Sequence, residues 1–325
     1  MKNKKKVCVV GVGKWGMNHV ATLQELGELG GIVEVNQILF KKIKKKYKNI
    51  QCYDNINDAL DFGFNAYIIS TPAETHYEIA KKIIHNGIHL LVEKPFTLNT
   101  ADAVKLHKLA LQKKVNLMVG HVLLFHPAFE KIKELIDDGI LGKIQYIYSN
   151  RLNLGTIRTQ ENVFWSFAPH DIAIFQWLTN SYPKNISSQG LDILQNGIHD
   201  TTITTLEYPD RLMGHIYVSW LHPFKEHRFV VVGSKGMIRF EDSKKGKPLV
   251  FYDKSIKWKD GKPLPVSGET WNIDYENGMP LKRELQYFIN HLNGKPLQKS
   301  NSESAIEVMQ ILENATQKLI GEDNG

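Results

Sequence analysis

The stretch of sequence that decides the fold is Val7-Cys8-Val9-Val10-Gly11-Val12-Gly13-Lys14-Trp15-Gly16. The apolar residues at its start predict a short buried strand, and a helical pattern follows its last glycine. Three glycines in the spacing Gly-x-Gly-x-x-Gly therefore lie where a strand turns into a helix. The first glycine allows a tight turn, the second lets backbone amides approach a phosphate, and the third lets helix and strand pack closely. The stretch predicts that a dinucleotide binds at the N-terminus of this helix.

The next hundred residues alternate short apolar runs with helical patterns. Strands are expected at 7–10, 31–35, 66–70, 89–92 and 116–119, and helices at 19–26, 36–46, 75–86 and 100–113. The apolar runs are continuous rather than alternating, which is typical of strands buried on both faces in a parallel sheet. We therefore expect residues 1–123 to form an α/β Rossmann domain.

The pattern changes from residue 124 onward. Helices are expected at 128–138 and near 169–178, and strands at 144–152, 201–208, 211–220, 228–232, 237–241 and 249–252. Turn residues at 208–211 and 233–236 predict two hairpins. Helical periodicity returns at 280–292 and 302–319. We expect residues 124–325 to form an α+β domain with a predominantly antiparallel open sheet, and the helices at about 280–320 to pack back on the sheet or on the first domain.

Composition limits the possible functions. The net charge is +7, but the lysines are scattered, and neither a zinc signature nor an RNA-binding aromatic motif accompanies them. We therefore expect no nucleic-acid partner and no metal. No apolar run approaches the ~18 residues of a membrane span, and the run at 7–12 after the basic start is too short for a secretory signal. Only two cysteines are present, which favours a reducing compartment. We expect a cytoplasmic protein that forms a homodimer or homotetramer through the open face of the second sheet.

Two further strand ends suit a dinucleotide. Glu34 ends the second strand, where a carboxylate accepts hydrogen bonds from ribose hydroxyls and repels a 2′-phosphate, so NAD is expected rather than NADP. The alternative takes Lys41 and Lys42 as phosphate ligands, although their helical positions face solvent. Ser70-Thr71-Pro72 ends another strand and suits a loop beside the cofactor. A simple helix-capping turn is the alternative for this loop, and a surface position is the alternative for His76.

Glu93-Lys94-Pro95 closes the apolar run at 88–92. A charged pair at the carboxyl end of a buried strand is costly unless it is used, and ligands bind at that end of open α/β sheets. The proline ends the hydrogen-bonding ladder directly after it. We therefore expect Lys94 to lie in a cofactor-dependent site.

These motifs, in this order, resemble the Gfo/Idh/MocA family of sugar and inositol dehydrogenases, and the resemblance extends over Met118-Val119-Gly120-His121. It implies that Lys94 lies by the nicotinamide and contacts the reacting hydroxyl, with Glu93 and Pro95 as its local supports. The residues expected to bind NAD are Gly11, Gly13, Lys14, Trp15, Gly16, Glu34, Ser70, Thr71, Pro72, His76, Glu93 and Lys94.

The second domain contains Trp165-Ser166-Phe167-Ala168-Pro169-His170-Asp171. A histidine in this setting is more often structural, but the resemblance places the family's catalytic histidine at His170. The ordinary pKa of a histidine, near 6.5, suits proton exchange with an alcohol. Asp171 is expected either to orient His170 or to pair elsewhere. Inositol-dehydrogenase-like members have an aspartate where this chain has Ser166, which weakens the case for an inositol substrate.

The segment from Ser149 to Arg158 resembles a narrower group, the dehydrogenases of bacterial surface-polysaccharide pathways that act at C3 of UDP-N-acetylglucosamine or its uronic acid. This resemblance implies a UDP-N-acetylhexosamine or its uronate as the substrate. The residues expected to contact substrate are Lys94, Arg151, Asn153, Arg158, Trp165 and His170. Ordinary sheet-surface polarity is the alternative for the arginines and Asn153, and a core position is the alternative for Trp15 and Trp165.

Three other functions remain open at the level of the sequence. One is a dehydrogenase of a free sugar or cyclitol, and another is a glycoside hydrolase that uses NAD transiently. The third is a non-catalytic NAD-binding regulator, against which the presence of both Lys94 and His170 argues.

Overall fold

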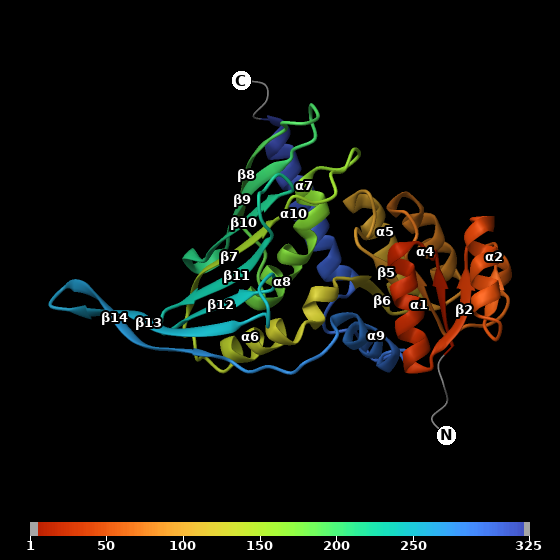
Figure 1. Cartoon of the computed structure of the whole chain (residues 1–325), viewed down its shortest axis with the longest axis horizontal. Coiled ribbons are helices and arrows are strands. Elements are labelled where there is room, and N and C mark those ends of the chain that lie inside the picture. The colour runs from red at the N-terminus through yellow and green to blue at the C-terminus, as the bar shows by residue number, and fades with distance from the viewer. Residues whose placement is uncertain (1–5, 322–325) are drawn as a thin grey trace. The chain divides into compact units, whose positions relative to one another are not determined.

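The computed structural model describes residues 6–321, so the basic start at residues 1–5 lies outside the described part. The chain divides into two compact units (Figure 1). The first unit contains residues 6–125 together with 278–309, and the second contains residues 126–277 together with 310–321. The C-terminal segment is therefore shared between the units.

The first unit is built on a parallel sheet with the strand order β3-β2-β1-β4-β5-β6. The strands are β1 (Val7–Val10), β2 (Leu29–Val33), β3 (Gln51–Tyr53), β4 (Ala66–Ile69), β5 (His89–Glu93) and β6 (Leu117–Gly120). The order reverses between β1 and β4, which is the switch point at which doubly wound sheets bind ligands. The predicted Rossmann architecture is confirmed. The three-residue strand β3 was not predicted, because it is too short to show a period.

Helices cover the sheet of the first unit. They are α1 (Lys14–Leu26), α2 (Gln37–Lys46), α3 (Ile56–Leu60), α4 (His76–His85), α5 (Thr100–Lys113) and α9 (Pro280–Asn290), with the 3-10 turns η1 (Ala73–Thr75) and η2 (Val122–Phe125). One apolar core joins strand residues to α3, α4, α5 and Ala305 of α10 (Ser302–Gly321). Helix α1 contacts β1, β2 and α9.

The C-terminal segment completes the edge of this sheet at β6. The main-chain N–H of Val119 donates to the carbonyl of Ser300 over 2.8 Å, and the Ser300 hydroxyl donates to the Val119 carbonyl over 2.5 Å. The Asn116 side chain donates to the carbonyls of His291 and Lys295 over 2.9 and 2.8 Å. The segment near residue 300 therefore covers the edge of the sheet at β6, which ends at residue 120.

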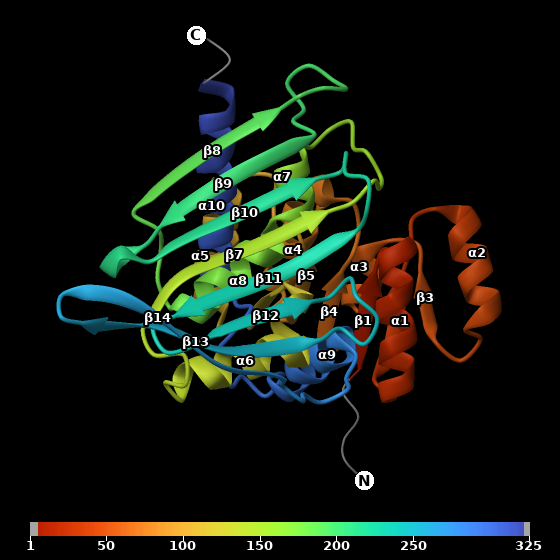
Figure 2. The ribbon, with the colours of Figure 1, turned by 60° about the vertical axis from the view of Figure 1, so that its left-hand side comes forward.

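The second unit contains a sheet with the order β14-β13-β12-β11-β7-β10-β9-β8 (Figure 2). The strands are β7 (Ile144–Leu152), β8 (Asn185–Leu191), β9 (Thr201–Glu207), β10 (Met213–Ser219), β11 (Glu226–Gly233), β12 (Met237–Glu241), β13 (Leu249–Lys259) and β14 (Lys262–Asn272). All neighbours are antiparallel except β7 and β10. The predicted antiparallel sheet and both hairpins are confirmed, whereas β8 and β14 were not predicted.

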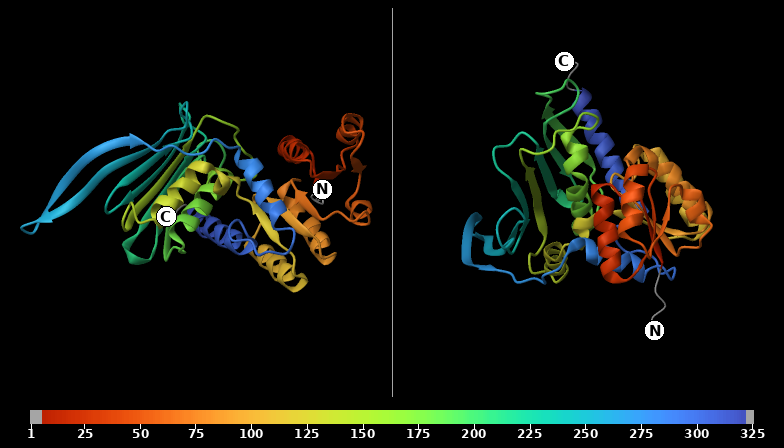
Figure 3. Two further views of the ribbon diagram at one scale, coloured as in Figure 1. Left: turned by 90° about the horizontal axis from the view of Figure 1, so that it is seen from below. Right: turned by 45° about the vertical axis from the view of Figure 1, so that its right-hand side comes forward.

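Helices lie on one side of this second sheet (Figure 3, left). The helical elements of the unit are α6 (Pro127–Asp137), α7 (Val163–Phe167), α8 (Pro169–Thr179), the 3-10 turn η3 (Pro209–Arg211) and the second half of α10. Phe129 and Phe175 pack on Phe229 of the sheet, with ring centroids 5.0 and 5.6 Å apart. Among the described residues of this unit, no helix lies against the opposite face (Figure 2). Tyr148 alternates with the buried Ile147 and Ser149, and its ring stacks on that of His215 with centroids 5.0 Å apart.

Among residues 6–321, no helix has both the length and the apolar character that crossing a membrane requires.

Candidate active site

The glycine-rich turn has the geometry that its sequence predicts. Gly11 has a φ of 83°, and a Cβ there would lie 2.7 Å from Thr71 Cγ2. A Cβ on Gly16 would lie 2.1 Å from the Gly11 carbonyl oxygen, so the third glycine lets α1 pack against the turn. A Cβ on Gly13, in contrast, would meet no atom of the described residues within 4 Å. The middle glycine therefore faces open space, as the approach of a phosphate requires.

The N-terminus of α1 is prepared for an anion. Gly13 provides no side-chain cap, and the first turn contains no acidic residue. The first amide groups of the helix and its dipole are thus available to negative charge. Lys14 and Trp15 begin the helix directly after this glycine, and both are exposed.

Glu34 lies directly after β2 and is tied to the same turn. Its carboxylate accepts hydrogen bonds from the main-chain N–H of Val12 over 2.9 Å and of Asn36 over 2.8 Å. The side chain is buried, whereas Lys41 and Lys42 on α2 are exposed. These residues fit a dinucleotide: the turn and α1 would hold its pyrophosphate, and Glu34 would hold a ribose.

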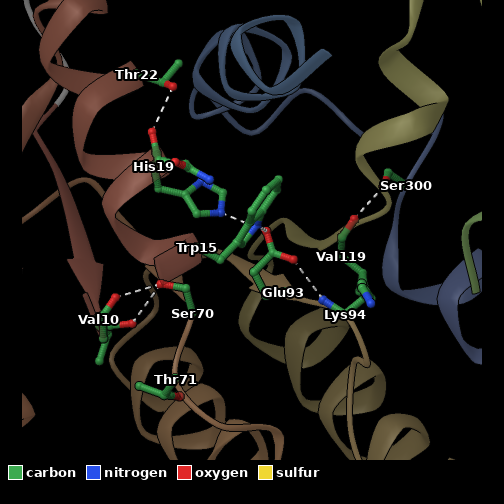
Figure 4. Close-up of polar contacts among 12 residues, drawn as sticks. Val10, Trp15, His19, Thr22, Ser70, Thr71, Glu93, Lys94, Val119 and Ser300 are labelled. Carbon is green, nitrogen blue, oxygen red and sulfur yellow. Dashed lines mark hydrogen bonds and ion pairs between the residues drawn. The ribbon is translucent and has the colours of Figure 1, made fainter. Parts of the chain in front are cut away.

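The loop after β4 is fastened to the glycine turn. The Ser70 hydroxyl donates to the Gly11 carbonyl over 2.7 Å (Figure 4). His76 is buried, and its ring nitrogens lie 2.9 Å from the carbonyl oxygens of Thr71 and Pro95. A protonated ring would donate to both oxygens, but burial lowers the pKa of His76. His76 is therefore a buried link between two loops and not a surface residue.

Glu93 ends β5 and gathers three hydrogen bonds (Figure 4). One carboxylate oxygen accepts from Trp15 Nε1 over 2.5 Å and lies 2.7 Å from His19 Nε2. The other accepts from the Lys94 main-chain N–H over 3.2 Å. Burial alone would raise the pKa of Glu93, but His19 and then Trp15 and the Lys94 amide hold the pKa below its ordinary value. The carboxylate thus remains charged beside Lys94, which precedes Pro95 through a cis peptide bond.

The end of β6 adjoins the same carboxylate. A Cβ on Gly120 would lie 2.9 Å from the Glu93 carboxyl carbon, so a side chain there would displace the carboxylate. His121 is buried, and burial lowers its pKa to about 4, with Glu93 raising the pKa and Lys94 lowering it. A neutral imidazole therefore lies close to both charged residues. His121 was noted in the sequence only as part of a motif, not as a site residue.

In the second unit, His170 is the second residue of α8 and Asp171 is the third. Arg151 on β7 donates to Asp171 through Nε over 2.7 Å and through Nη2 over 2.9 Å. Burial alone would lower the pKa of Arg151, but the charge of Asp171 raises it. Asp171 therefore pairs with Arg151. The Arg151 guanidinium is engaged within the protein, and it anchors the turn of helix that contains His170.

The other expected substrate residues of this unit lie after β7. Arg158 is exposed, and its Nε lies 3.7 Å from Glu161. Asn153 is half-buried in the same loop. Trp165 lies on α7, where its Nε1 donates to the Thr316 hydroxyl of α10 over 2.8 Å. Of the two expected arginines, Arg158 is the one whose guanidinium is largely exposed.

Two further residues of the first unit were not predicted from the sequence. His19 lies one helical turn after Trp15, and this i, i+4 spacing is the signal that would have paired them. Glu284 on α9 is fully buried and lies four residues before the buried Phe288, on the apolar face of its helix. An acidic residue on an apolar face was the available signal.

The fold and the turn-and-strand-end geometry together define a dinucleotide-binding protein of the Rossmann class. Comparison with known families then narrows the class. The family model described as "Oxidoreductase family, NAD-binding Rossmann fold" matches residues 5–121, and the "GFO/IDH/MocA C-terminal domain" matches residues 129–239. The chain belongs to the Gfo/Idh/MocA family of oxidoreductases, and its first unit is an NAD-binding Rossmann domain.

Relatives within the family carry several names. UDP-N-acetylglucosamine 3-dehydrogenase of Acidithiobacillus ferrooxidans is 27% identical over 184 residues, which cover 56% of this chain and 57% of that protein. Its solved structure has a TM-score of 0.85 at 20% identity and covers 97% of both chains. The WlbA dehydrogenase from Bordetella pertussis, solved with NADH and UDP-GlcNAcA, has a TM-score of 0.79 at 17% identity and covers 98% of both chains.

An inositol enzyme is equally similar in sequence. The scyllo-inositol 2-dehydrogenase (NAD(+)) of Bacillus subtilis is 26% identical over 254 residues, which cover 73% of this chain and 74% of that protein. The two family models establish the family, and the structural likenesses establish the fold. They leave the sugar substrate open.

Proposed function

We propose that this protein is an NAD-dependent dehydrogenase that oxidises the C3 hydroxyl of a UDP-N-acetylhexosamine or its uronic acid in surface-polysaccharide biosynthesis. The observation that carries the proposal is the charged cluster at the end of β5, where Glu93 fixes the main chain of Lys94 beside the NAD-binding turn. The choice of substrate rests on the resemblance of residues 149–158 and on the two relatives that act on or were solved with UDP-N-acetyl sugars.

Each candidate residue has a proposed role. Gly11, Gly13, Gly16 and the first amides of α1 hold the pyrophosphate of NAD, and Glu34 holds a ribose. NAD supplies the hydride acceptor for the alcohol carbon. Lys94 hydrogen-bonds the substrate oxygen as carbonyl character develops, and His170 accepts the hydroxyl proton. Arg151 holds the start of α8 through Asp171, so that His170 keeps its orientation. Arg158 and Asn153 contact the charged or hydroxyl groups of the substrate, and Trp165 packs near it.

We further infer a cytoplasmic location and a homo-oligomer. Both cysteines are free thiols, which suits a reducing compartment. The open face of the second sheet exposes Ile203 and Met213 by 51% and 41%, and a second copy of the chain would cover them.

A cyclitol dehydrogenase is the second candidate, because the scyllo-inositol enzyme matches more of the chain than the first UDP-sugar relative does in sequence. Ser166 argues against it, since inositol-dehydrogenase-like members have an aspartate there. Ser166 is buried at 8% exposure and offers no charge.

The test measures the formation of NADH by its absorbance when the protein is given NAD and each member of a panel of UDP-sugars, free sugars and inositols. Each assay is repeated with 2-oxoglutarate as an external oxidant, because an enzyme that retains NADH needs one to turn over. We expect a signal with UDP-N-acetylhexosamines or their uronates and none with inositols. Oxidation of inositols alone, or no reaction across the panel, would overturn the proposal.

A further inference from the structure

Glu284 is an acid that the proposed mechanism does not use. It lies on α9 of the first unit with 0% exposure, and neither of its carboxyl oxygens has a hydrogen-bond partner among the described residues. A charged carboxylate in such a place costs several kcal/mol, so a carboxyl group there retains its proton instead. An acid of this kind destabilises the fold at neutral pH, and groups with strongly shifted protonation are concentrated at functional sites.

The charged and titratable groups around Glu284 come from each neighbouring element. Glu93 of β5 is the group that interacts with it electrostatically. Helix α1 packs on α9 and carries two titratable groups, His19, which lies against Glu93, and Glu25, which is paired with Lys282 at the exposed edge of the two helices. His121 follows β6, and η2 contributes no titratable group. Burial and then the charge of Glu93 raise the pKa of Glu284 well above its ordinary value.

The carboxyl groups of Glu93 and Glu284 differ in their hydrogen bonding. Glu93 receives hydrogen bonds from Trp15, from the Lys94 main chain and at His19, whereas Glu284 receives none from residues 6–321. Two carboxylates buried in one region cannot both ionise cheaply, so one proton is shared unequally between them. Because the hydrogen-bond donors are all at Glu93, Glu93 is the charged member of the pair.

The charge on Glu93 joins two parts of the NAD site. Trp15 and His19 come from the first turns of α1, whose first amides would hold the pyrophosphate of NAD, and the third donor is the main chain of Lys94 (Figure 4). A charge-assisted hydrogen bond is roughly twice as strong as a neutral one, so the carboxylate is a firm junction between these segments.

We propose that Glu93 is a positioning residue that fixes Lys94 against the first turn of α1 through Trp15, and that Glu284 holds the single proton of the carboxyl pair so that Glu93 stays charged. The role of Glu93 in turnover rests on the proposed function, because it takes Lys94 as catalytic. The protonation of Glu284 does not rest on the proposed function.

The protonation of Glu284 is tested by comparing the stability of the Glu284→Gln variant with that of the wild-type protein from pH 5 to pH 8. Because the pKa of Glu284 is raised in the folded protein, the wild type loses stability as pH rises above the ordinary value of 4.5. The unfolding equilibrium constants should therefore diverge by up to about tenfold per pH unit in favour of the variant. Glu25→Gln, an exposed carboxylate at the same helix pair, is the control and should show no such divergence.

A constant difference across this pH range, or a variant that is less stable at pH 7 than at pH 5 relative to the wild type, would overturn the proton assignment. The infrared spectrum of the wild-type protein labelled with ¹³C-glutamate gives a second measurement that needs no variant. It should show the carbonyl band of a neutral carboxylic acid at pH 7, and its absence would also contradict the assignment.

The positioning role is tested by a double-mutant cycle of Trp15→Phe and Glu93→Gln. Removal of one hydrogen bond to a charged group should lower kcat by roughly tenfold or more. The double variant should be no slower than Glu93→Gln alone, because both changes break the same junction. Trp258→Phe on the exposed ribbon of β13 and β14 is the control for losing an indole.

Additive losses in the cycle, or a normal kcat for Glu93→Gln, would overturn the positioning role. If the wild-type protein oxidises none of the tested substrates, the proposed function fails. In that case the double-mutant cycle uses NAD affinity, measured by calorimetry, in place of kcat. The effects of the two substitutions on NAD affinity are again expected to be non-additive. The two failures are therefore distinguishable.

Discussion

Lys94 in the first unit and His170 in the second each adjoin a buried carboxylate in the sequence, Glu93 in one case and Asp171 in the other. Glu93 is held by two ring nitrogens and a main-chain amide. Asp171 is held by both arms of a single guanidinium, that of Arg151. The first arrangement coexists with a second buried acid, Glu284, whereas the second arrangement pairs opposite charges directly. The charge of Glu93 therefore depends on which of two carboxyl groups holds the proton, whereas the charge of Asp171 is balanced by Arg151.

The largest effects are expected from the candidate catalytic residues themselves. His170→Asn and Lys94→Ala should each lower kcat by about 10²–10⁴-fold, because positioned acid–base groups contribute on that scale. NAD affinity should change little in His170→Asn. The measurement is steady-state kinetics with the substrate found in the panel. Near-normal rates in both variants would show that neither adjoining carboxylate supports a catalytic residue.

The ion pair of the second unit should be costly to break from one side. Arg151→Met leaves Asp171 buried and unpaired, which should lower the free energy of unfolding by about 3–5 kcal/mol. Arg158→Ala is the matched control. Its ion pair with Glu161 is largely exposed, so the loss should be within about 0.5 kcal/mol. Urea denaturation measures both, and equal losses would contradict the anchoring role of Arg151.

A smaller effect is expected from two buried histidines, one in each unit. Burial lowers the pKa of His121 and of His126 from 6.5 to about 4. The unfolded chain binds these protons first, so their stabilisation is present above pH 6.5 and is lost as pH falls toward 4. At about 1.4 kcal/mol per unit, each histidine should account for about 3 kcal/mol of acid destabilisation. His121→Asn and His126→Asn should therefore flatten the stability profile between pH 6.5 and 4, and an unchanged profile would contradict the burial argument.

The sequence predicted the parts of the molecule in which a local pattern matches a local structure. The glycine turn, the buried strands of the first sheet and the two hairpins of the second sheet all have short-range signals. The strands β3, β8 and β14 were missed because β3 has only three residues, β8 has a largely polar sequence, and β14 is exposed along nearly its whole length. Their place depends on a neighbouring strand rather than on their own period.

The site was predicted to the same extent. Glu34, Lys94 and the glycines could be proposed as site residues because the ends of parallel strands meet at one edge of a sheet. The engagement of Arg151 by Asp171 was not predicted, since residues 20 positions apart in sequence show no spacing that links a strand to a helix. Glu284 was missed because it is nearly 200 residues from Glu93, and only the tertiary fold brings α9 into the first unit.

The covered edge of β6 has a consequence for synthesis on the ribosome. Val119 is made long before Ser300, with which it exchanges two hydrogen bonds. At about 5–20 residues per second, roughly 10–40 seconds separate the two. The nascent NAD-binding domain therefore waits with an unpaired strand edge while residues 126–277 of the second unit are translated, and its completion depends on the synthesis of residues near 300.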